Sequence, residues 1–146
     1  MTTVLPASPD EAVALRDRAV AHFQRKAWAE ARADFARARE LDPSDLESWV
    51  GLGMSLAMVN EIYPAIEVFE TLLAGHPDYA RGHLQLGLLY YKLCVTAKGR
   101  THLERALACR PTLAQRRLIE GVLQEQAKLD QRRYYRPDFE ALRARA

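Results

Sequence analysis

The chain has 146 residues, a net charge of +2, 49% hydrophobic residues and 27% charged residues, which is the profile of a globular protein with one core. Its longest apolar run, residues 49–59, is shorter than the roughly 18 residues that a membrane-spanning helix needs, so the sequence predicts no membrane segment. The N-terminus lacks the basic start and apolar stretch of a secretory signal, and two cysteines do not indicate a disulfide scaffold, so we expect a cytoplasmic protein.

The pattern along the chain favours an all-α protein, because alanine, leucine and arginine are abundant and β-branched runs are missing. The first helix is predicted to begin at Pro9, where Ser8 caps it and Glu11 completes a capping box. Later helix starts are indicated by Ser44 with Glu47, by Asp78, and by Thr112 with Gln115. We therefore expect helices at about 9–25, 28–41, 45–59, 62–74, 79–93, 96–109 and 112–132, with a short helix after Pro137.

Three prolines, Pro43, Pro77 and Pro111, follow these helix pairs at a constant interval of about 34 residues, which we call the repeat period. The middle unit reads W-x2-L-G from Trp49, then A-x3-F from Ala65, then the proline, and the third unit repeats the pattern with small changes. The first unit is degenerate in its first helix. This register strongly resembles the tetratricopeptide repeat family over residues 12–113.

The resemblance implies a right-handed superhelical stack of three helix-turn-helix repeats, at about 12–45, 46–79 and 80–113. The helix at about 112–132 would cover the open end of the stack as a capping helix. We expect one domain at residues 1–133 and a basic tail at 134–146; residues 110–146 carry nine Arg/Lys against five Asp/Glu, a net charge of +4.

Small residues recur where the two helices of a repeat are expected to cross closely: Ala19 with Ala31, Gly53 with Ala65, and Gly87 with Gly99. Glycine costs about 1 kcal/mol in a helix, so its use here predicts a steric need. Gly51 does not fit this pattern, and the sequence offers no reason for it.

A second apolar stripe lies one residue beyond the packing stripe on the first helix of each repeat, about 100° around the helix. The resemblance implies that this face lines the concave side of the superhelix, where partner segments bind. The predicted groove residues are Arg16, Val20, Phe23, Val50, Met54, Ala57, Met58, Arg81, Leu84, Leu88, Tyr91 and Lys92, with Gln24, Val13 and Glu47 beside them. The alternative is that the C-terminal helix or tail buries this stripe.

Catalytic and metal chemistry is not indicated. His83 and His102 share a repeat and could approach each other, but no carboxylate or thiol at ligand spacing joins them. Cys94 and Cys109 lie at opposite ends of one helix, too far apart for a disulfide. We expect no enzymatic activity, no cofactor and no metal.

The predicted function is a non-catalytic protein-protein interaction module, an adaptor, scaffold or chaperone that binds an apolar or amphipathic partner segment. One subtype of the family holds a C-terminal carboxylate; Arg16 and Arg81 match two of its basic positions, but Val20 and Gly51 replace its asparagines and Gln85 a further arginine. The pattern is more similar to three-repeat secretion chaperones. Alternatives are self-assembly through the first repeat or the tail, and the disfavoured binding of nucleic acid by the arginines and tyrosines of residues 132–136.

Overall fold

The computed structural model describes residues 8–134 and 143–144, and within them the chain forms seven α-helices and no strand. The helices are α1 (Pro9–Gln24), α2 (Trp28–Leu41), α3 (Leu46–Met58), α4 (Ile62–Gly75), α5 (Ala80–Lys92), α6 (Thr96–Ala108) and α7 (Leu113–Tyr134). The predicted all-α stack is confirmed, and each helix end lies within two residues of its predicted place. The short helix expected after Pro137 begins outside the described residues. No helix of the described part is long and apolar enough to cross a bilayer.

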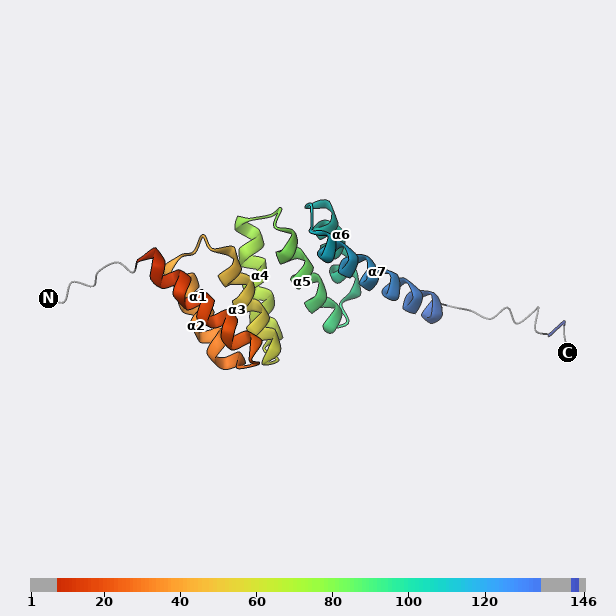
Figure 1. The fold of residues 1–146 in the computed structure, drawn as a ribbon. Coiled ribbons are helices and arrows are strands. Elements are labelled where there is room, and N and C mark those ends of the chain that lie inside the picture. Colours follow the sequence, from red (N-terminus) through yellow and green to blue (C-terminus); the bar gives the residue numbers. More distant parts are fainter. Residues whose placement is uncertain (1–7, 135–142, 145–146) are drawn as a thin grey trace.

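Successive helix pairs lie side by side, with α7 at the far end (Figure 1). One hydrophobic cluster runs from Ala19 in α1 to Leu86 and Tyr90 in α5. A second joins Leu84 of α5 with Leu103 of α6 and Ile119 of α7, among others. Helix α5 therefore contributes to both clusters and connects the third repeat to the first two.

The turns inside the repeats have one geometry. Lys26, Asn60 and Cys94, each one repeat period from the next, adopt a left-handed backbone conformation, with φ of 61°, 65° and 60°. These residues lie in the α1–α2, α3–α4 and α5–α6 turns. The first repeat therefore shares the turn of the others, although its first helix departs from the sequence pattern.

Two of the predicted helix caps are confirmed. The Ser8 Oγ accepts a hydrogen bond from the Glu11 backbone N–H at 3.3 Å. Thr112 and Gln115 form a reciprocal pair, in which each backbone N–H donates to the other side chain, at 3.0 and 3.2 Å. Both caps follow the physical rule that a side-chain oxygen satisfies an N–H group that lacks a partner inside the helix.

The other two predicted caps are wrong. Asp45, one residue nearer to α3, caps that helix by accepting from the Glu47 backbone N–H at 3.3 Å. Ser44 instead donates its hydroxyl to Asp42 at 2.5 Å. The residue before α5 is Tyr79, whose side chain makes no capping bond, and the Asp78 carboxylate lies 3.7 Å from the Arg105 guanidinium.

Glycines mark the closest approaches between helices. A Cβ atom on Gly87 would lie 3.1 Å from the Gly99 carbonyl oxygen, which confirms the predicted close crossing of α5 and α6. The structure also explains Gly51, because a Cβ atom there would overlap the Phe35 ring of α2. Gly51 therefore leaves room for an aromatic side chain of the preceding repeat, an interaction between repeats rather than within one.

The outward positions of α7 lack the apolar packing residues that α5 carries. The positions that correspond to the packing residues His83, Leu86, Gly87 and Tyr90 of α5 are Arg117, Glu120, Gly121 and Gln124, and all four are exposed. A Cβ atom on Gly121 would have no neighbour within 4 Å. On the opposite side, Ile119 is fully buried. Helix α7 thus packs on one face and presents the other to solvent, as an end helix must.

Candidate partner-binding groove

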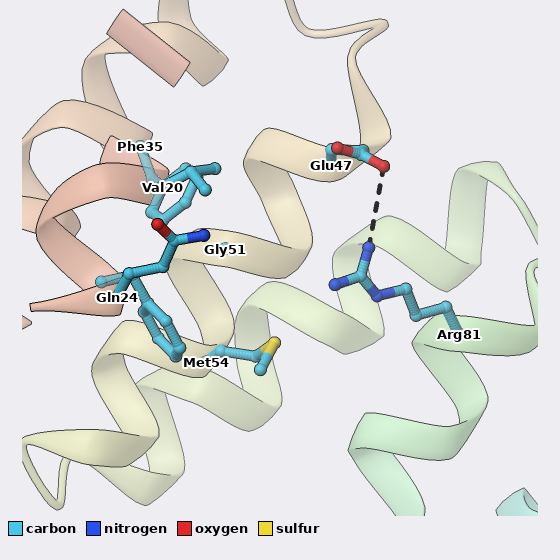
Figure 2. Close-up of a pocket in the computed structure, with 8 residues that line it drawn as sticks. Val20, Gln24, Phe35, Glu47, Gly51, Met54 and Arg81 are labelled. Atoms are coloured by element: carbon cyan, nitrogen blue, oxygen red, sulfur yellow. Dashed lines mark ion pairs between the residues drawn. The ribbon is translucent and has the colours of Figure 1, made fainter. Parts of the chain in front are cut away.

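A concave cavity of about 190 Å³ lies where α1, α3 and α5 face one another. Its lining residues are Val20, Phe23 and Gln24 of α1, Phe35 of α2, Glu47, Gly51 and Met54 of α3, and Arg81 of α5 (Figure 2). Apolar side chains from the first two repeats form most of its surface, and an ion pair stands at the edge. We call this cavity, together with the exposed Met58 and the partly exposed Leu88, which lies one repeat period after Met54, the groove.

One position of the repeat carries an apolar residue in every first helix. Val20, Met54, Leu88 and Val122 follow one another at the repeat period and belong to α1, α3, α5 and α7. Val20 is 38% exposed, and the other three are partly exposed. They form a series of partly exposed apolar side chains on successive helices.

Burial divides the predicted groove residues. Val50 and Leu84 are 0% and 3% exposed and lie in the two hydrophobic clusters, beneath the groove rather than on it. Leu88 and Tyr91 pack against the cluster that contains Ile119 of α7. In the third repeat, therefore, part of the stripe packs into a cluster that α7 shares. Arg16, Phe23, Ala57 and Arg81 are half-buried, while Met58 and Lys92 are exposed.

Acidic side chains partner both arginines of the predicted set. The Arg81 guanidinium lies 3.8 Å from the Glu47 carboxylate (Figure 2). Arg16 contacts Asp45 at 3.1 Å and Asp17 at 3.6 Å. Carboxylates of the same chain thus neutralise the positive charge at this edge. The apolar surface is the main remaining feature of the groove, and burying such surface is favourable.

Helix α1, which carries Val20 and Phe23, is tied to α2 by a buried carboxylate. The Asp34 side chain accepts two hydrogen bonds from the Arg18 guanidinium, at 2.6 and 2.8 Å, and His22 lies 3.7 Å away. The hydrogen bonds from Arg18 lower the pKa of Asp34, although burial of the carboxylate acts in the opposite direction. The ionised form of Asp34 is therefore part of the native structure.

Replacing Asp34 by asparagine is expected to lower the free energy of unfolding at pH 7 by about 1 kcal/mol, because Arg18 is largely exposed and its ion pair is screened by solvent. The pKa of Asp34 is lower in the folded chain than the unfolded value of about 3.9, so this contribution is present above about pH 4 and disappears as the pH falls further. Urea denaturation at pH 7, 5 and 3 measures it. Asp17→Asn, at an exposed carboxylate, is the control; a difference for Asp34→Asn that persists at pH 3 would contradict the role of charge.

His83 and His102 do approach each other, with 3.2 Å between their Nδ1 atoms. Within the described residues, no group of three or more histidine, cysteine, aspartate or glutamate side chains is placed to hold a metal ion. Cys94 and Cys109 are both free thiols.

The sequence pattern did not identify two residues of this face. Phe35 was not among the predicted groove residues, yet its ring lines the cavity beside Gly51. Val122 continues the series of Val20, Met54 and Leu88, and one further repeat period would have found it. No spacing pattern marks Phe35 in this way, because the position of its ring in the cavity depends on how two repeats pack against each other.

Comparison with known proteins finds similarity to a repeat family in part of this chain. A family model described as Tetratricopeptide repeat matches residues 12–45. Superkiller protein 3 of Saccharomyces cerevisiae is 32% identical over 60 residues, which are 41% of this chain and 4% of that protein. The chain therefore corresponds to a small fraction of the length of this relative.

Solved structures share the fold at low sequence identity. The TPR domain of Sgt2 from Aspergillus fumigatus has a TM-score of 0.75 at 15% identity, over 94% of this chain and 93% of that one. The first TPR of Spaghetti (RPAP3), bound to the HSP90 peptide SRMEEVD, has a TM-score of 0.71 at 14% identity, over 84% and 98%. MamA has a TM-score of 0.68 at 22% identity, over 86% and 74%. These similarities establish the fold.

Proposed function

We propose that this chain is a tetratricopeptide-repeat protein and a non-catalytic interaction module that holds an apolar or amphipathic segment of a partner protein in the groove. The observation that carries the proposal is the set of partly exposed apolar side chains, Val20, Met54 and Met58, on the concave side of the first two repeats. Methionine suits such a surface, because its flexible thioether adapts to irregular partners.

The same fold holds an HSP90 peptide, SRMEEVD, in the solved RPAP3 structure. That peptide is acidic at its C-terminal end, whereas both arginines at the edge of this groove already face carboxylates. A bound acidic terminus would have to displace Asp45 or Glu47 from its arginine. The charge arrangement therefore favours a segment that binds through apolar side chains, and we expect SRMEEVD to bind weakly or not at all.

The test is selection of peptides from a random displayed library on the purified protein, followed by affinity measurements by fluorescence anisotropy. We expect the selected peptides to be rich in apolar residues. Met54→Glu and Leu88→Glu should each weaken their binding at least tenfold, because an unpaired carboxylate would be buried under the peptide. Tyr63→Glu, at a side chain of α4 that is 74% exposed and outside the groove lining, is the matched control.

Two results would overturn the proposal. One is a selected consensus that ends in acidic residues and a free carboxylate. The other is wild-type affinity in Met54→Glu and Leu88→Glu variants whose circular dichroism spectra and unfolding midpoints match those of the native protein.

A further inference from the structure

Three stacked aromatic rings, those of His83, Tyr90 and His102, lie in the third repeat and connect four segments of the chain. The His102 ring of α6 stacks against His83 and Tyr90 of α5, with ring centroids 5.5 and 5.6 Å apart. The Tyr90 hydroxyl donates to Glu70 of α4 at 2.8 Å, and the Nε2 atom of His83 lies 2.6 Å from the carbonyl oxygen of Pro77 in the α4–α5 loop. The stack thus joins α4, the loop, α5 and α6.

The proton positions in this stack follow from the hydrogen bonds. A carbonyl oxygen only accepts, so the Nε2 atom of His83 carries a proton and its Nδ1 atom, when the ring is neutral, does not. That bare Nδ1 atom must accept the proton on Nδ1 of His102, 3.2 Å away. Each ring therefore carries one proton in the native arrangement.

The preceding repeat contains the same contact in a form that cannot titrate. Trp49 occupies the position of His83 one repeat earlier, and its indole N–H donates to the Pro43 carbonyl at 2.9 Å. An indole nitrogen is always a donor, which supports the assignment of the proton on His83. The counterpart of His102 is Val68. The second repeat is thus an internal reference for the third.

Additional protons act unequally on the two rings. A proton on Nε2 of His102 leaves the hydrogen bond to His83 intact. An N–H group on Nδ1 of His83 would face the N–H group on Nδ1 of His102, so the hydrogen bond between the rings exists only in the arrangement described above. An extra proton therefore either places a charge on His102 within the stack or removes this hydrogen bond.

The other charged groups near the stack do not remove this conflict. The Glu70 carboxylate accepts from Tyr90, Lys98 lies 5.5 Å above the Tyr90 ring, and Glu104 lines the same hollow as the two histidines. Arg105 of α6 and Asp78 of the loop pair with each other at 3.7 Å. Burial and then the neighbouring His83 lower the pKa of His102; Glu70 raises it, and Lys98 lowers it further by a smaller amount.

We propose that the contact between His83 and His102 is sensitive to protonation. It holds α5 and α6 of the third repeat together at neutral pH and weakens below about pH 6, near the ordinary titration range of histidine. A histidine with a lowered pKa in the folded state binds fewer protons than it does in the unfolded chain. Stability therefore falls as the pH drops through about 6.5 and below. Loosening α5 also moves Leu88, so acid weakens the C-terminal end of the groove; this last step rests on the proposed function, whereas the loosening does not.

Hydrogen exchange of the intact chain at pH 7.5 and 5.5, corrected for the intrinsic exchange rate, tests the proposal. Losing one buried hydrogen bond changes an opening equilibrium by about tenfold. We expect the opening of α5 and α6 to increase by about tenfold more than that of α3 and α4, whose Trp49–Pro43 contact does not titrate. His76→Gln, at an exposed histidine of the neighbouring loop, should leave this difference unchanged.

Two variants make the test decisive. His102→Gln retains a donor for His83 without a titratable ring, and the pair His83→Trp with His102→Val copies the second repeat. Both should abolish the excess opening at pH 5.5. An equal response of both repeats in the native chain, or an excess that persists in His102→Gln, would overturn the proposal whatever the groove binds.

Discussion

Replacing Gly51 by alanine lowers the free energy of unfolding by about 1–3 kcal/mol, the usual cost of overpacking a filled core. The added Cβ atom would overlap the Phe35 ring, and Phe35 is only 4% exposed, so the ring has little room to move. The same replacement at Gly121 raises the free energy of unfolding by about 0.5–1 kcal/mol, because alanine is the better helix former and its Cβ atom would meet nothing.

Urea denaturation followed by circular dichroism measures both effects, and Gly121→Ala is the control for a change of helix propensity alone. A second variant identifies the cause. If the Phe35 ring is the obstacle, adding Phe35→Leu to Gly51→Ala should cost less than the sum of the two single changes. Strict additivity, or a Gly51→Ala protein as stable as the native one, would show that the packing of α2 against α3 does not require glycine.

The sequence predicted the features that repeat. Prolines, small residues and apolar positions recur once in every repeat period, so each helix was supported by its counterparts in the other units. The first repeat shows the strength of this signal: its first helix departs from the pattern, yet α1 lies where the register requires it. Regular spacing reports local structure well, because helix packing constrains the same positions in every unit.

Features that depend on contacts between repeats were harder to predict. Gly51 had no explanation until the Phe35 ring of the preceding repeat was placed against it. Val50 and Leu84 share the periodicity of exposed groove residues, but the neighbouring elements cover them. Spacing also predicted Ser44 as the cap of α3, where the structure has Asp45. Composition and periodicity thus predicted which face of each repeat forms the groove, without determining which of its residues are exposed.

Replacing Ile119 by alanine is expected to cost about 2–5 kcal/mol, the range for truncating a fully buried aliphatic side chain. Ile119 is 0% exposed and packs with Leu84, Leu103 and Ala106, so it is the main apolar anchor of α7. Its neighbour Leu118 is 48% exposed, and Leu118→Ala should change stability by no more than about 0.5 kcal/mol. The two adjacent truncations separate the anchoring role from the general effect of losing an apolar residue.

The loss should also be local, because each repeat of such a stack is stabilised chiefly by its neighbours. Both tryptophans, Trp28 and Trp49, lie in the first two repeats, so their fluorescence reports that part of the chain while circular dichroism reports all helices. In Ile119→Ala, the unfolding midpoint by circular dichroism should therefore fall below the midpoint by fluorescence. Coincident midpoints would mean that α7 stabilises the whole stack as one unit. A separation would mean that α7 holds the third repeat, and with it Leu88, in place, so that the end helix determines how far the groove extends.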